Sequence, residues 1–205
     1  MALRSKLDPE QKHKQALETI VTLADHLTTH VNDLFLIARG EAGLNNFQML
    51  EVDLAKIVSE AVDQQKSLFK LGSATLNFEM PNHSYLTRGE GQRLIQLVHI
   101  LLTNAITHSP KGVCVDVTMT QNSDWVGFCV RDDGRGIPRE QRETVFDFFS
   151  DISDPQHSSM LGTGLGLPIA KCIVTGHNGR IEISDCRNIG AEISVSLPRK
   201  SRMKS

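Results

Sequence analysis

Two glycine-rich stretches decide how this sequence folds: DDGRGI at residues 132–137 and GTGLGL at residues 162–167. The first directly follows an apolar run with strand character, and the second directly precedes a helical pattern. Glycines let a backbone approach a ligand closely, and amides at a helix N-terminus favour phosphate. Each stretch alone is equally typical of a turn or a helix start, so the neighbouring segments have to decide between these interpretations.

The pattern around these stretches predicts a mixed domain. Apolar periodicity and alternation predict helices over 53–69, 90–107, 139–146 and 164–177, and strands over 74–80, 84–88, 113–120, 125–131, 180–185 and 191–197. Helices and antiparallel strands therefore segregate, and the predicted fold class is α+β, a two-layer α/β sandwich.

A long helix precedes this domain. Asp8 suits the N-cap position and Pro9 the first helical position, and Gly40 and Gly43 are expected to end the helix. Apolar residues recur at steps of three and four, at Leu17, Ile20, Ala24, Leu27, Val31, Leu34 and Ala38. One such helix is unstable alone, so its seam must be buried in a coiled coil or a four-helix bundle.

Composition excludes several classes of protein. The 205 residues are 40% hydrophobic with a formal net charge of −2, which favours neither nucleic acid nor an anionic membrane as the main partner. The four cysteines are widely spaced, without metal-binding spacing, as expected in a reducing compartment. No apolar run approaches the length of a membrane span and the amino end is polar, so we expect a soluble, cytoplasmic chain.

The motifs together resemble a known family. LLTNA at 101–105 is similar to an N box, and VFDFF at 145–149 is similar to an F box. With both glycine-rich stretches, they resemble the ATP-binding domain of two-component sensor histidine kinases, in the superfamily that also contains gyrase, Hsp90 and MutL. The resemblance implies the histidine-kinase ATPase fold, with 1–44 as the second helix of a dimerisation hairpin, 45–198 as the catalytic ATP-binding domain and 199–205 as a tail.

The resemblance also implies roles for single residues. Asp132 would accept a hydrogen bond from the adenine amino group, Gly136 would let the base approach, and Asn104 would coordinate Mg²⁺. Residues 147–161 would form a lid over the nucleotide. The remaining positions implied to bind nucleotide are Gly134, Ile137, Gly162, Thr163, Gly164, Leu165, Gly166 and Leu167.

The implied function is that of a protein-histidine kinase. It would use ATP and Mg²⁺ to phosphorylate a histidine on the dimerisation hairpin, outside this chain, for relay to a response-regulator aspartate. The implied partners are a response regulator or receiver domain and another histidine kinase hairpin, in a homodimer or heterodimer. The resemblance further implies the cytoplasmic part of a membrane-anchored sensor, with membrane contact only through parts absent from this chain.

Several positions depart from the family pattern. Ile100 stands where the family usually has asparagine, Thr107 where it has lysine, and residues 147–161 contain no Lys or Arg. Each missing charged hydrogen bond would weaken nucleotide binding by about 1.5–3 kcal/mol. The alternative is therefore a degenerate kinase core that binds nucleotide weakly or not at all and regulates another kinase through helix pairing. A third possibility is a protein-serine kinase of the anti-sigma type or another ATPase of this superfamily.

Overall fold

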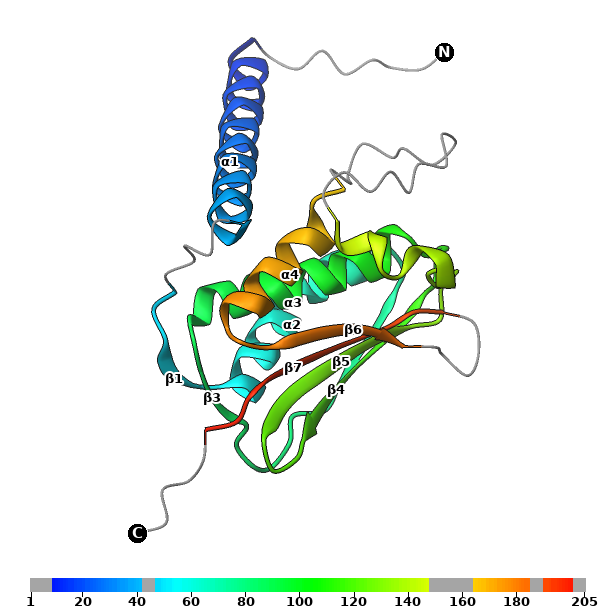
Figure 1. The fold of residues 1–205 in the computed structure, drawn as a ribbon. Helices are drawn as coiled ribbons and strands as arrows, with labels where there is room; N and C mark the ends of the chain where they lie inside the picture. Colours follow the sequence, from blue (N-terminus) through cyan, green and yellow to red (C-terminus); the bar gives the residue numbers. More distant parts are fainter. Residues whose placement is uncertain (1–8, 42–46, 148–163, 185–189, 201–205) are drawn as a thin grey trace. The chain divides into compact units, whose positions relative to one another are not determined.

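The computed structural model describes residues 9–41, 47–147, 164–184 and 190–200 (Figure 1). It divides into two compact units, Met1–Gly43 and Leu44–Ser205. The first unit contains helix α1, Pro9–Glu41, which continues through Gly40 instead of ending there. On its predicted seam, the side chains of Leu17, Ile20, Leu27, Val31 and Leu34 are 48–65% exposed. A bundle partner for this seam stays a prediction.

The second unit has two layers, with helices on one face of a five-stranded sheet (Figure 1). The helices are α2 (Leu54–Leu71), α3 (Gly91–Thr107) and α4 (Gly166–Gly176). The sheet has the order β2-β4-β5-β7-β6, with β2 Thr75–Phe78, β4 Cys114–Gln121, β5 Trp125–Asp132, β6 Arg180–Ser184 and β7 Glu192–Pro198. The predicted α+β two-layer sandwich is confirmed.

The apolar faces of the sheet and of the helices form the core between the two layers. Val115 and Val117 of β4 are buried, as are Ile57 and Val58 of α2 and Leu97 of α3. The α2 helix begins where predicted, because Asp53 Oδ1 accepts the N–H of Ala55 (3.2 Å) and also that of Tyr85 (3.0 Å). This one carboxylate therefore fixes the start of α2 against the segment that leads into β3.

Two features of the strands were not predicted. Leu50–Asp53 forms β1, which pairs antiparallel with β3, Leu86–Gly89, in a separate two-stranded sheet. The strands were predicted to be antiparallel, and this is wrong for β2, which pairs parallel with β4, with Thr75 opposite Cys114. A parallel pair needs a long crossover connection, and β3 and α3 supply it.

Two predicted helix limits also change. The helix predicted over 139–146 is instead two 3-10 turns, η1 (Arg139–Gln141) and η2 (Thr144–Phe146). The α4 helix begins at Gly166 and not at Gly164, because Gly164 has a φ of +67°, outside the helical region. Of the lid predicted over 147–161, the structure describes Asp147 alone, and the rest lies outside the described residues.

Candidate nucleotide-binding site

The carboxylate of Asp132 stands at the end of β5. Its Oδ1 accepts the backbone N–H of Gly134 (2.9 Å) and that of Ala191 (3.3 Å). Burial raises the pKa of this carboxyl group, and the two N–H groups partly oppose that shift. Within the described residues Oδ2 has no hydrogen bond, so it can accept one from a ligand N–H group.

The backbone around this carboxylate leaves no room for side chains. A Cβ on Gly134 would lie 2.0 Å from Ser109 Oγ, and one on Gly136, where φ is +74°, would lie 2.6 Å from the carbonyl oxygen of Gly190. Gly190 itself has a φ of +122°, and its Cβ would lie 1.9 Å from the carbonyl oxygen of Asp132. Gly190 therefore belongs to this site, although the sequence analysis did not include it. Its only sequence signal is a glycine directly before the last predicted strand.

The loop that follows Asp132 is held by backbone contacts at both ends. Asp133 accepts the N–H of Cys114 through Oδ1 (2.8 Å), and its own N–H donates to the Cys114 carbonyl (3.2 Å). At the other end, Arg142 Nε donates to the carbonyl of Ile137 (3.0 Å). Ile137, predicted to bind nucleotide, is half-buried at this point.

Both glycine-rich stretches lie beside helix α3 in space. Asn104 is half-buried on α3, and His108, which ends the helix, lies close enough to Asp132 for their charges to interact. One turn before Asn104, Ile100 faces the start of α4, since a Cβ on Gly166 would lie 3.4 Å from Ile100 Cγ2. The structure therefore brings Asp132, Asn104 and Gly166 to successive points along one helix.

The second glycine-rich stretch is described from Gly164 onward, and Gly162 and Thr163 lie outside the described residues. Leu165 is the N-cap of α4, and Gly166 and Leu167 are its first two residues. The third residue is Pro168, which has no N–H group. The first turn of α4 therefore offers an anion the backbone amides of Gly166 and Leu167 only.

Two basic side chains, Arg135 and Lys171, were not among the predicted site residues. Arg135 Nε donates to the His108 carbonyl (3.3 Å), and Lys171 Nζ lies 4.0 Å from Asp147 Oδ1 at the end of η2. The pKa of His108 is lowered by burial and by the Arg135 charge, against the opposing effect of Asp132, so this imidazole is largely neutral at pH 7. Neither position was predicted, because the family pattern places its basic residues at the position of Thr107 and in the lid.

The described residues lack a metal-binding cluster and a membrane-spanning helix. They contain no group of three or more His, Cys, Asp or Glu side chains placed to bind a metal ion. None of the described helices is long and apolar enough to cross a bilayer.

Comparison with known proteins gives a consistent result. The sequence profile of the histidine kinase-, DNA gyrase B- and HSP90-like ATPase family matches residues 89–201. The chain is 27% identical over 197 residues to the sensor-like histidine kinase SenX3 of Mycolicibacterium smegmatis, covering 96% of this chain and 51% of that protein. It is 29% identical over 201 residues to the signal transduction histidine-protein kinase BaeS of Escherichia coli, covering 96% of this chain and 43% of that protein. The chain thus spans about half the length of these curated relatives.

Solved structures share the fold. The catalytic domain of histidine kinase ThkA superimposes with a TM-score of 0.65 at 24% identity, covering 75% of this chain and 96% of that one. Full-length ShkA, solved in complex with AMPPNP, superimposes with a TM-score of 0.73 at 20% identity, covering 97% of this chain and 41% of that one.

Proposed function

The chain belongs to the histidine kinase-, DNA gyrase B- and HSP90-like ATPase family, as the ATP-binding catalytic part of a sensor histidine kinase, and we propose how its residues act. In the whole protein, this domain binds Mg-ATP and delivers the γ-phosphoryl group to a histidine on a dimerisation hairpin. The phosphoryl group then passes to an aspartate of a response regulator.

The observation that carries the proposal is the carboxylate of Asp132. One oxygen is held by two backbone N–H groups, and the other has no hydrogen bond among the described residues. An oriented acceptor surrounded by glycine backbone suits the amino group of adenine, because the base can approach closely and present its N–H edge. Gly134, Gly136 and Gly190 let the surrounding backbone pack closely enough to hold this carboxylate in place.

The phosphates would lie between α3 and the start of α4. The amides of Gly166 and Leu167 point out of a helix N-terminus, where the helix dipole favours negative charge. Gly164 approaches the ligand without a side chain, and Gly162, Thr163 and Leu165 complete the same stretch in the proposal. The AMPPNP complex of ShkA supports a triphosphate ligand for a domain of this fold.

A magnesium ion fits the residues that are present. Asn104 is half-buried, and the described residues give its side chain no hydrogen bond, so its amide oxygen is available as a ligand. Magnesium in nucleotide sites takes one or two protein oxygens, with phosphates and water supplying the rest, so a single amide is sufficient. The ion would neutralise phosphate charge, and Asn104 would fix its position. Ile100 adds no ligand.

The domain organisation supports relay to a partner. We propose that residues 1–44 are the second helix of the dimerisation hairpin, that 45–198 are the catalytic domain and that 199–205 are a tail. The two compact units, with a boundary at Gly43, support this division. The exposed seam of α1 supports pairing with another kinase hairpin, in a homodimer or a heterodimer. Neither the comparisons nor the described residues favour the degenerate alternative.

Calorimetric titration of the chain with Mg-ATP and Mg-ADP tests the proposal, with Asp132→Ala as the blank. We expect micromolar binding that the substitution abolishes, and weaker binding when Mg²⁺ is omitted. Absence of binding up to millimolar nucleotide would contradict the proposal and favour the degenerate core.

A further inference from the structure

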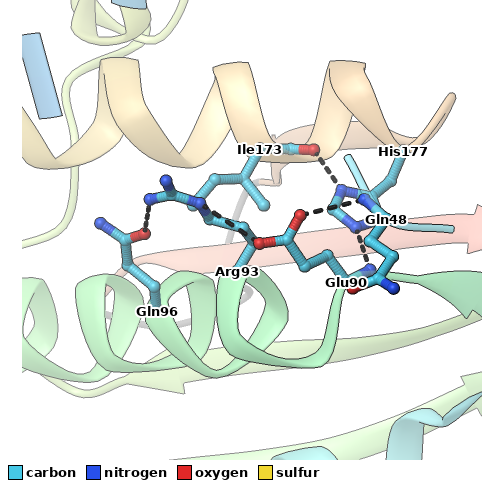
Figure 2. A network of polar contacts seen from close by, with 6 residues as sticks. All are labelled: Gln48, Glu90, Arg93, Gln96, Ile173 and His177. Atoms are coloured by element: carbon cyan, nitrogen blue, oxygen red, sulfur yellow. Dashed lines mark hydrogen bonds and ion pairs between the residues drawn. The ribbon is translucent and has the colours of Figure 1, made fainter. Parts of the chain in front are cut away.

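His177 joins the two helices that flank the nucleotide site, at the end far from that site. It follows the last residue of α4 and its side chain is 1% exposed. Its Nδ1 donates to the Ile173 carbonyl (2.7 Å), and its Nε2 accepts the backbone N–H of Glu90 (3.0 Å) at the start of α3 (Figure 2). One donor and one acceptor define a single neutral tautomer, so both ring nitrogens are satisfied.

The segment that leads into the domain is fastened at the same point. The Phe47 ring stacks on the His177 ring with centroids 4.8 Å apart and planes 25° apart. Gln48 donates its backbone N–H to Glu90 Oε2 (3.1 Å) (Figure 2). The Phe47 ring also fills the space beside Gly176, where a Cβ would lie 2.2 Å from the ring. We call Phe47, Gln48, Glu90 and His177 the clasp.

The Glu90 side chain binds within the clasp and does not cap its own helix. It is the N-cap residue of α3, yet its side chain makes no capping hydrogen bond. The carboxylate instead accepts from Gln48 and lies 3.9 Å from Arg93 Nε. The carboxylate therefore stabilises the attachment of the arriving chain, in place of a cap on α3.

The clasp and the nucleotide site lie at opposite ends of the same helix pair. Gly166 lies beside Ile100, whereas His177 lies beside Glu90, so α3 and α4 run antiparallel. The rise of an α-helix places the two ends of this pair about 16 Å apart. A change at the clasp can therefore alter how the arriving chain is held without removing any group that would touch the nucleotide.

We propose that Phe47 and His177 are positioning residues for phosphoryl transfer, and this inference rests on the proposed function. The clasp fixes the point at which the preceding chain is attached to the α3–α4 pair. Without it, residues 47 and 48 are released as far as Met49, whose carbonyl still accepts from Arg88 Nη2 (3.1 Å), and this adds up to about 7 Å of reach. Longer reach lowers the effective concentration of one reactant near another and loosens their relative orientation. The rate of transfer falls, whereas nucleotide affinity does not.

Three variants test the inference: Phe47→Ala, Gly176→Ala and the double variant. Phe47→Ala removes the stacked ring, and Gly176→Ala displaces it through the added Cβ while favouring the helix. Leu50→Ala is the matched control, because Leu50 is 57% exposed and lies next to the clasp without joining it. Amide hydrogen exchange in the present chain reports attachment at Gln48, and the full-length kinase reports kcat and KM for ATP.

We expect both single variants to speed exchange at Gln48 and to lower kcat by about threefold or more, with KM for ATP within twofold of wild type. The double variant should match Phe47→Ala alone, because both changes remove the same contact. An unchanged kcat despite faster exchange, or an equal change in KM, would overturn the inference. If the wild-type kinase transfers no phosphoryl group, the proposed function is contradicted instead. The wild-type measurement comes first, so this outcome is distinguished from a failure of the inference.

Discussion

Replacing Asp132 with asparagine changes the hydrogen-bonding character of one atom while keeping the shape of the side chain. In Asp132→Asn, the amide oxygen can still accept from Gly134 and Ala191, the two backbone partners of the present carboxylate. The second position becomes an NH2 donor, which faces the adenine amino group donor to donor. We therefore expect ATP binding to weaken while the apo domain stays folded.

The size of the effect follows from the bond that is lost. A hydrogen bond to a charged group contributes about 1.5–3 kcal/mol, which corresponds to about a 10- to 150-fold rise in Kd. Inosine triphosphate should respond in the opposite sense, because its base has a carbonyl oxygen where adenine has the amino group. The new NH2 group can donate to that oxygen, whereas the wild-type carboxylate repels it.

Calorimetry with both nucleotides measures the change, and thermal denaturation of the apo variant serves as the control. The reasoning predicts that the ratio of Kd values for inosine triphosphate and ATP reverses on Asp132→Asn. Equal weakening of both nucleotides without loss of apo stability would refute the assignment of Asp132 as the group that reads the base.

Three further predictions concern the same domain. Gly190→Ala should destabilise the domain by about 2 kcal/mol or more, because the new Cβ would collide with the Asp132 carbonyl and the residue has a positive φ. Chemical denaturation measures the free energy of unfolding, and a loss below about 0.5 kcal/mol would contradict the prediction. Thr107→Lys should lower the Kd for Mg-ATP by about 3- to 10-fold, and added salt should reduce this gain. An unchanged Kd at low salt would contradict the proposed position of the ATP phosphates near the end of α3. Burial lowers the pKa of His99 and of His177 below the usual 6.5, so the unfolded state binds more protons than the folded state just below that pH. The free energy of unfolding should therefore fall as the pH drops from 7 to 5, and denaturant midpoints that stay constant over this range would contradict this.

Much of the fold could be predicted from the sequence, because the signals are local. The apolar faces of α2 and α3 follow a helical period, and the cap at Asp53 is a short-range contact. The strand Leu50–Asp53 escaped prediction because four residues are too few to show alternation, and only pairing with β3 defines them. The parallel register of β2 and β4 depends equally on distant residues.

The candidate site divides in the same way. Asp132, Gly134 and Gly136 stand in one contiguous stretch, so the sequence could indicate them together. Gly190 and His177 could not be found in this way, because their importance comes from contacts with Asp132 and with Glu90, 58 and 87 residues away in the chain, respectively. Spacing along the sequence carries no information about such contacts until the sheet and the helix pair are formed.

Transfer of the γ-phosphoryl group is the most direct test of the account. The full-length protein is incubated with Mg²⁺ and ATP labelled at the γ-phosphate, beside Asp132→Asn and a variant lacking the hairpin histidine. We predict a protein-bound label that is lost in acid and stable in base, as expected of phosphohistidine, and that is strongly reduced in both variants. Wild-type protein that stays unlabelled at saturating ATP would contradict the kinase assignment.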